Sequence, residues 1–330
     1  MKHVLLRNSR LKGWEFGVLR ALEEAIVQQT GAEVVEVQAY GMHPVVKRAG
    51  HGMRFEGVRS LIPKKKLQIE ADVLWYILMC PENYELDFYT GWEQVPKRIV
   101  YIFDTLVPHF SIVKKLFSGN AFNILITSFH DATVHLEQLT GNQWHAVEQA
   151  VPPQTFHLIE KSEKSIHFSS YGRRHTRFHH FLIDFCLHHN LYYDYSTHNG
   201  PNLWTHENEL YRQYAWHIQH SIFTVSWPVE VTNPQRAGYF NPITCRWFEA
   251  AACGTVIVGQ TPDNTLFDHL LHPNLVVPIN PDGKKETIFE GLESLWRNKD
   301  QYQQTAYVIS RKIGERLTWK NRVLRILQLI

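Results

Sequence analysis

Short apolar runs alternate with longer amphipathic stretches along the N-terminal half of the chain. Most of these runs are continuously apolar, which is typical of strands buried on both faces of a parallel sheet. Apolar residues also repeat with helical spacing over 16–29, and Gly31 ends that predicted helix. Strand, helix and strand in repetition predict a doubly wound α/β domain. The expected strands lie at 3–6, 34–37, 73–78, 98–103 and 123–127.

The same rhythm resumes in the C-terminal half after a break. Val151-Pro152-Pro153 and the polar run 160–164 predict a linker at 152–164. We therefore expect an N-terminal Rossmann-like domain over 1–155, a second over 156–310, and a helix over 311–330 that packs back toward the first. The second domain is expected to contain strands at 166–169, 192–195, 221–225 and 256–259, and helices at 176–189, 207–216 and 244–252.

Composition narrows the class of protein. Of 330 residues, 44% are hydrophobic, which excludes a disordered or fibrous chain, and the net charge of +2 lacks the basic excess of nucleic-acid binders. The four cysteines form no C-x-x-C pair and are expected to be buried, reduced thiols. The first residues contain too short an apolar run for a signal peptide, and the longest run, 71–80, is too short for a membrane span. A soluble, cytoplasmic protein is expected.

The most informative segment is 241–259, which predicts a loop, a short helix capped by Thr244, a glycine at the helix end and then a strand. Gly238, in the preceding loop, permits close approach of the backbone. A helix start behind such a loop is suited to a phosphate. Glu249 lies one and a half turns into the helix, where a carboxylate could accept hydrogen bonds from two vicinal hydroxyls. The alternative is that Glu249 is a solvated helix residue or a capping partner.

The stretch Arg246-Trp247-Phe248-Glu249-Ala250-Ala251-Ala252-Cys253-Gly254 resembles the donor-binding helix of GT-B glycosyltransferases, close to the CgeB-like (spore-maturation-type) group and glycosyltransferase family 4. The segment Leu317-Thr318-Trp319-Lys320-Asn321-Arg322-Val323 resembles the end of the same group. The resemblance implies two Rossmann-like domains facing across a cleft, with the donor nucleotide on the second. It implies that Glu249 holds the ribose. Asn241 stands where the broader family has another glutamate.

A second candidate is the loop 169–177, which carries three arginines around a glycine. Guanidinium groups offer forked donors to phosphate oxygens and keep their charge. We therefore predict diphosphate contact here, without assigning it to one arginine; the alternative is a set of solvated surface charges. The residues of this prediction are Tyr171, Gly172, Arg173, Arg174 and Arg177, and with Trp227, Gly238, Tyr239, Asn241, Thr244, Arg246 and Glu249 they make up the expected donor site.

A third candidate is Asp104, at the carboxyl end of a predicted strand, where open α/β sheets bind ligands. It could orient or deprotonate an acceptor hydroxyl. His130, after the next strand, is its rival. Either Asp104 or Asp131 could instead cap the following helix, the role favoured for Asp131.

Other signals are weaker. Trp227 and Tyr239 flank the expected phosphate loops and could stack on a base or a sugar ring, although many aromatic residues of this half are expected in the core. The histidines of 179–189 lack the partners of a zinc site, and no Asp-x-Asp pair or P-loop is present. We therefore expect no cofactor and no metal, with charge stabilisation by arginines and a helix dipole.

Together these observations predict a metal-independent glycosyltransferase of the hexosyltransferase type. It would move a sugar from a nucleotide-diphosphate-sugar donor to a hydroxyl of a glycan, lipid or small molecule, with peripheral membrane contact if the acceptor is a lipid. The alternatives are a sugar-nucleotide epimerase of the same fold and a non-catalytic carbohydrate-binding or assembly protein. Base, sugar, acceptor, stereochemistry and oligomeric state stay open.

Overall fold

The structure is a computed structural model that describes the chain except for residues 10, 12, 14–15, 38–63 and 196–206. It divides into two compact units. Unit 1 comprises Met1–Lys12, Leu22–Val147 and Val323–Ile330, and unit 2 comprises Gly13–Ala21 and Glu148–Arg322. The linker that the sequence predicts at 152–164 therefore lies inside unit 2.

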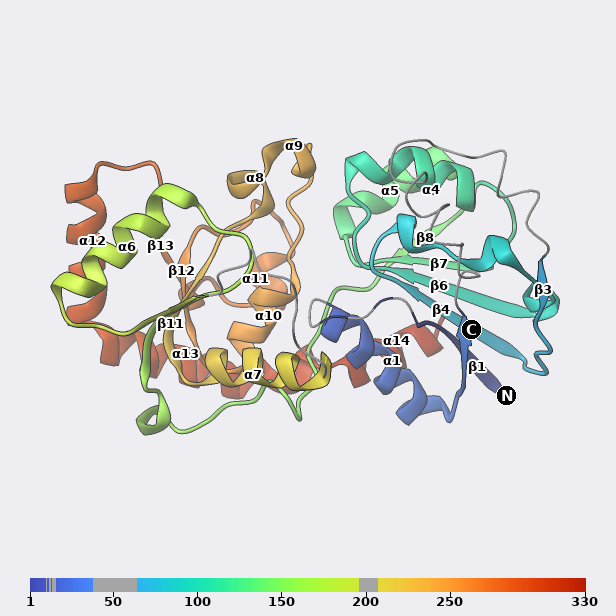
Figure 1. Cartoon of the computed structure of the whole chain (residues 1–330), viewed down its shortest axis with the longest axis horizontal. Coiled ribbons are helices and arrows are strands. Elements are labelled where there is room, and N and C mark those ends of the chain that lie inside the picture. The colour runs from blue at the N-terminus through green and yellow to red at the C-terminus, as the bar shows by residue number, and fades with distance from the viewer. Residues whose placement is uncertain (10, 12, 14–15, 38–63, 196–206) are drawn as a thin grey trace, which may run out of the picture. The chain divides into compact units, whose positions relative to one another are not determined.

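Unit 1 is built on a parallel sheet with the strand order β2-β1-β4-β6-β7-β8 within its described part. Strand β2 lies on one side of β1, and β4, β6, β7 and β8 follow in order on its other side. Because such crossovers are right-handed, α1 lies on one face and α4 and α5 on the other (Figure 1). The elements are β1 (His3–Asn8), α1 (Gly17–Thr30), β2 (Glu33–Val37), β4 (Val73–Leu78), β6 (Lys97–Ile102), α4 (Phe110–Phe117), β7 (Ile124–Thr127), α5 (Thr133–Thr140) and β8 (Trp144–Ala146), with a separate pair β3 (Lys65–Lys66) and β5 (Tyr89–Thr90).

Unit 2 is built on a second parallel sheet, with the strand order β10-β9-β11-β12-β13 among the residues that the structure describes. Its direction reverses between β9 and β11, so this too is a doubly wound sheet. The elements are β9 (Ile166–Ser170), α6 (Thr176–His188), β10 (Tyr193–Tyr195), α7 (Glu207–Gln219), β11 (Ser221–Ser226), α8 (Val229–Thr232), α9 (Pro234–Ala237), α10 (Cys245–Ala252), β12 (Val256–Gly259), α11 (Phe267–Leu270), β13 (Val276–Pro278), α12 (Lys285–Arg297) and α13 (Lys299–Ile313). Helix α14 (Trp319–Leu327) begins in unit 2 and belongs to unit 1 from Val323 onward.

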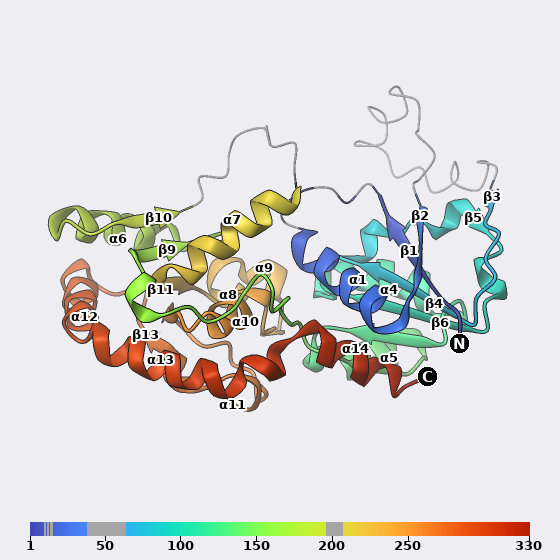
Figure 2. The same cartoon turned by 90° about the horizontal axis from the view of Figure 1, so that it is seen from below.

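Helices cover the sheet of unit 2 in two groups. α6 and α12 pack against each other (Figure 2), and α10 packs against α7. Phe168 and Phe223, on the neighbouring strands β9 and β11, stack with ring centroids 5.1 Å apart, and Phe185 of α6 meets Phe168 edge-on at 6.3 Å. All three rings are fully buried, and each such side chain stabilises the fold by roughly 1.5–3 kcal/mol.

The predicted strands and helices are found close to their expected positions, which confirms the α/β class and the parallel sheets. Four of the described strands are missing from the prediction: β3 and β5, with two residues each, and β8 and β13, with three. Strands this short leave no hydrophobic run that stands out. The expectation that all four cysteines are buried is wrong for Cys80 and Cys245, which are half-buried, while Cys186 and Cys253 are buried.

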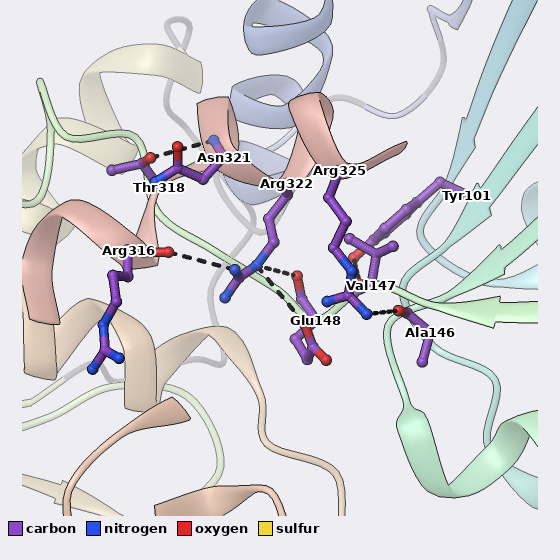
Figure 3. A network of polar contacts seen from close by, with 9 residues as sticks. All are labelled: Tyr101, Ala146, Val147, Glu148, Arg316, Thr318, Asn321, Arg322 and Arg325. Carbon is purple, nitrogen blue, oxygen red and sulfur yellow. Dashed lines mark hydrogen bonds and ion pairs between the residues drawn. The ribbon is translucent and has the colours of Figure 1, made fainter. Parts of the chain in front are cut away.

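The C-terminal tail makes backbone contacts with the segment that follows unit 1. Val151 pairs in parallel with Thr318, its N–H donating to the carbonyl of Leu317 at 2.8 Å. Arg322 Nε donates to the carbonyl of Glu148 at 3.2 Å and lies 4.0 Å from that residue's carboxylate (Figure 3).

The last residues of the tail belong to unit 1. There Arg325 Nη2 donates to the carbonyl of Ala146 at 3.0 Å, and Tyr101 Oη donates to that of Val147 at 2.8 Å. Both contacts join residues of unit 1.

Candidate functional site

The reversal of strand order between β9 and β11 marks a place in unit 2 where a ligand is expected. In open α/β sheets, ligands bind outside the carboxyl ends of the strands at this switch point. The loop that begins at Tyr171 follows β9, and Trp227 follows β11. Helices of such units run back along the strands, so the start of α10 lies at the same edge.

Arg246 of α10 lies directly against the loop that follows β9. A Cβ atom built on Gly172 would stand 1.8 Å from Arg246 Nη2 and 2.5 Å from Cζ, and Gly172 has a φ of +78°. Both observations require glycine at this position, for space and for backbone conformation. The structure thus joins two segments that the sequence predicts separately. Beside this contact is a small recess lined by Tyr171, Tyr214, Ile218, Thr224, Val225, Ser226 and Arg246.

Helix α10 begins and ends where the sequence predicts, but the predicted cap by the Thr244 side chain is wrong. Thr244 is its N-cap in extended conformation, but the threonine side chain makes no capping hydrogen bond. At the other end Gly254 has a φ of +58° and donates to the carbonyl of Ala251, while Thr255 donates to that of Ala250. These two bonds form a Schellman motif. The N-terminus of α10 carries the positive end of the helix dipole, and it lies at the edge of the sheet that holds the Gly172 loop.

Glu249 is an internal residue of unit 2, neither solvated nor a cap. Its side chain is 2% exposed, and Tyr214 Oη of α7 donates to Oε2 at 2.6 Å. Burial raises the pKa of Glu249 to about 7, although the hydrogen bond from Tyr214 and the charge of Arg246 act to lower it. A ribose bound by Glu249 would have to share this carboxylate with Tyr214.

Tyr171 is part of a polar network that sequence reasoning missed. Its hydroxyl donates to Asp194 Oδ2 at 2.7 Å, and His217 Nδ1 pairs with the same oxygen. Burial alone would raise the pKa of Asp194, but the hydrogen bonds from His217 and Tyr171 outweigh it, so the pKa is lowered. In the sequence, the sign of this network is an acidic residue, Asp194, between the two tyrosines of β10.

The arginines of the loop differ in their contacts. Arg174 Nη1 lies 3.1 Å from His179 Nε2, and Arg177 Nη1 donates to the carbonyl of Asp282 at 3.2 Å. Burial, and then the charge of Arg174, lowers the pKa of His179 to about 4. His179 is thus neutral at pH 7 and accepts from Arg174 through Nε2. Arg173 is half-buried. Arg246 is the arginine that contacts the glycine of the loop.

The two aromatic candidates have opposite surroundings. Trp227 is 3% exposed and meets Phe178 edge-on at 5.1 Å, so the structure places it in the core. Tyr239 is 60% exposed and follows Gly238, whose φ of +62° favours glycine. Of the two, only Tyr239 presents its ring to solvent.

In unit 1, Asp104 and His130 follow the neighbouring parallel strands β6 and β7, whose ends are in register through Ile102 and Thr127. Asp104 is half-buried, its N–H donates to the carbonyl of Met79 at 2.7 Å, and its carbonyl lies 3.0 Å from His109 Nδ1. His130 is exposed. The two candidates therefore share one edge of the sheet.

The helix-cap role favoured for Asp131 is wrong. That residue lies inside the 3₁₀ turn His130–Ala132, whose N-cap is Phe129, and the N-cap of α5 is Ala132.

Within the described residues, no group of three or more His, Cys, Asp or Glu side chains is placed to hold a metal ion. The described helices include none with the length and apolar character to cross a membrane.

Comparisons with known proteins agree with this picture. The family model described as glycosyl transferase-like matches residues 154–328, about half of the chain. No curated protein matches the sequence. Among solved structures, a glycosyltransferase from Rickettsia africae ESF-5 is similar with a TM-score of 0.56 at 10% identity, covering 99% of this chain and 97% of that one.

Trehalose-6-phosphate synthase OtsA is similar with a TM-score of 0.57 at 10% identity, over 99% of this chain and 98% of its own. A trehalose-6-phosphate structure from E. coli, bound with UDP-2-fluoro glucose, has a TM-score of 0.56 at 10% identity over the same shares of the two chains. These similarities show the GT-B fold, and the match over 154–328 shows that the chain belongs to the glycosyl transferase-like family.

Proposed function

We propose that this chain is a glycosyltransferase of the CgeB-like group that moves a hexose from a nucleotide-diphosphate-sugar donor to an acceptor hydroxyl, without a metal. The observation that carries the proposal is the contact of Arg246 with Gly172 at the switch point of unit 2. It places a guanidinium group and a helix start at one edge of the sheet, and both suit a diphosphate. The family match covers this unit.

The donor would be held by unit 2. Its diphosphate would contact the Gly172 loop, Arg246 and the first turn of α10, and Glu249 would bind its ribose. Negative charge grows on the diphosphate as the bond to the sugar breaks, and fixed donors that already face it lower the barrier. A trehalose-6-phosphate structure of the same fold is described as bound with UDP-2-fluoro glucose, which supports a nucleotide sugar as the ligand class.

A panel of nucleoside diphosphates tests the donor site. A ligand at about one hundred times its Kd stabilises a folded protein by about 3 kcal/mol, which corresponds to a rise of about 4 °C in Tm for a chain of 330 residues. We expect at least one of the uridine, guanosine, adenosine and thymidine diphosphates to raise the Tm in this way. If none does at millimolar concentration, the proposed donor site is wrong.

Incubation with the matching nucleotide sugar then separates the classes of protein. A transferase consumes the donor only when an acceptor is present, apart from slow hydrolysis. An epimerase converts the sugar without any acceptor. A carbohydrate-binding protein does neither.

We further propose that Asp104 accepts the proton of the acceptor hydroxyl as that oxygen attacks the sugar. A general base contributes about 100-fold to 10,000-fold to a rate. The variant Asp104→Asn should therefore lower turnover by about 100-fold or more and leave the Kd of the nucleoside diphosphate within about twofold of wild type.

The variant His130→Gln is the matched control for this prediction, because His130 follows the neighbouring strand of the same sheet. It should keep turnover within a few-fold of wild type. Loss of turnover in His130→Gln with retention in Asp104→Asn would assign the base to His130.

A further inference from the structure

The sheet of unit 1 has a switch point of its own. In its described part the strand order reverses between β1 and β4, and open α/β sheets bind ligands outside the carboxyl ends of the strands at such a point. The chain leaves β4 through the 3₁₀ turn Pro81–Asn83, and it leaves the neighbouring strand β6 through Asp104. Glu82, Asp104 and His109 lie next to one another at this edge.

The backbone of Asp104 is fixed on both sides. Strands β4 and β6 are paired along their length. The pairing continues beyond β6, because the N–H of Asp104 donates to the carbonyl of Met79 at 2.7 Å. The carbonyl of Asp104 accepts from His109 Nδ1 at 3.0 Å. Both backbone groups of Asp104 are therefore held, which sets the direction of its Cα–Cβ bond and leaves only the rotamers of its side chain to be chosen.

His109 joins two segments through its two ring nitrogens. The residue is buried at the N-cap of α4. Because a backbone carbonyl can only accept, the Nδ1 that faces Asp104 carries a hydrogen. On the far side of the ring, Nε2 lies 3.5 Å from Glu82 Oε1. An ionised carboxylate also only accepts, so Nε2 binds Glu82 when it too carries a hydrogen, as in the imidazolium form.

The turn that carries Glu82 is itself anchored. The carbonyl of Asn83 accepts from Asn8 Nδ2 at 3.0 Å, and the N–H of Cys80 donates to Asn83 Oδ1 at 3.2 Å. Asn8 is the last residue of β1 and is buried. The ring of His109 is therefore supported by a turn that is tied to the strands on both sides of the switch point.

We propose that His109 is a positioning residue that orients Asp104 for proton transfer through the hydrogen bond from Nδ1, while Glu82 steadies the far side of the ring. The inference rests on the proposed function, in which Asp104 takes the proton of the acceptor hydroxyl. A base must lie within hydrogen-bond reach of the proton that it takes. A residue that orients the base therefore affects the rate of transfer more than the binding of the donor.

Two variants of His109 separate the roles of its nitrogens. The amide nitrogen of asparagine is as many bonds from the backbone as Nδ1, and that of glutamine is as many as Nε2. His109→Asn can still donate to the Asp104 carbonyl, so its kcat should stay within about threefold of wild type. His109→Gln loses this donor, and its kcat should fall by about tenfold or more. The KM for the nucleotide sugar should stay within about twofold in both.

A double-mutant cycle with Asp104→Asn shows whether His109 acts through Asp104. In the Asp104→Asn background, His109→Gln should cost less than about threefold further, because the base that it orients is already lost. A general effect on the fold would instead give costs that multiply. Turnover is measured as release of the best-binding nucleoside diphosphate from its glucose conjugate, with alkyl glucosides as acceptors. The Tm without ligand checks that each variant folds.

Glu82→Ala carries the test if His109→Gln does not fold. The Glu82 side chain is 45% exposed, so its removal should leave the fold intact. The kcat should fall by about threefold, which is the worth of an exposed ion pair. An unchanged kcat would overturn the part assigned to Glu82.

Equal losses of kcat in His109→Asn and His109→Gln would overturn the inference, because the contact from Nδ1 would then not matter. So would costs that multiply in the double variant, or a His109→Gln variant as fast as wild type, while Asp104 stands as the base. Turnover that survives Asp104→Asn would overturn the proposed base and the inference with it. A wild type that neither transfers nor hydrolyses the sugar would overturn the proposed function.

Discussion

The variant Gly172→Ala should lose nucleoside diphosphate binding by more than about tenfold while the protein still folds. A Cβ at this position would stand 1.8 Å from Arg246 Nη2, so the guanidinium must move away from the loop. The φ of +78° adds a backbone cost of about 1–2 kcal/mol for a residue with a side chain. Calorimetric titration measures the affinity, and urea unfolding measures the stability.

Gly291→Ala is the matched control. Gly291 lies within α12, its φ is not in the left-handed region, and a Cβ there would meet nothing within 4 Å. Alanine favours a helix over glycine by about 1 kcal/mol, so this variant should be slightly more stable than wild type and bind the diphosphate equally well. Unchanged affinity in Gly172→Ala would show that Arg246 and its loop do not hold the diphosphate.

The variant Glu249→Ala should lower both donor affinity, by more than about tenfold, and the free energy of unfolding, by about 2–4 kcal/mol. The stability loss follows because Glu249 is buried and Tyr214 Oη would lose its acceptor. Tyr214→Phe separates the two effects: it removes the internal partner and keeps the carboxylate. We expect it to destabilise the protein by about 1–2 kcal/mol and to bind the diphosphate within about threefold of wild type.

If Glu249→Ala binds the nucleotide as wild type does, the ribose contact is wrong. If Tyr214→Phe loses as much affinity as Glu249→Ala, the carboxylate acts by holding α7 against α10 and not by touching the ligand. Measuring affinity and unfolding on the same samples distinguishes these results.

The raised pKa of Glu249 also predicts how stability depends on pH. Between 4.5, its ordinary value, and about 7, the folded state keeps the proton on Glu249 while the unfolded state releases it. The contribution of this group is therefore present below pH 4.5 and is lost as the pH rises through 7. Relative to Glu249→Gln, which does not titrate, wild type should lose about 2–3 kcal/mol between pH 4.5 and 8. A constant difference across this range would contradict the internal position of Glu249.

Sequence patterns were sufficient for the architecture because it depends on local periodicity. The continuous apolar run Val73–Leu78 is buried throughout, and the glycine after α10 adopts the left-handed conformation that ends helices. The start of α10 was predicted from Thr244 as a capping residue, and the helix begins there although the threonine side chain makes no capping hydrogen bond. The contacts of single side chains were not predicted correctly.

Those failures have physical causes. Glu249 belongs to a helix in which Trp247 to Ala252 are all buried, so it has no polar face that periodicity could reveal. Asp194 and Asn241 acquire their partners from other elements of unit 2, Asn241 from Glu230 of α8, and no spacing along the chain reports such contacts. Trp227 was placed near the ligand because it flanks an expected phosphate loop, but its ring packs on Phe178.

A crystal structure of the chain with the nucleoside diphosphate that binds it best is the most direct test of the account. The account predicts that the diphosphate lies against Gly172, Arg246 and the first turn of α10, with the ribose toward Glu249. A ligand bound at another part of unit 2 would contradict it. So would a structure at saturating nucleotide in which the Arg246 side chain still packs on Gly172 and no ligand lies there.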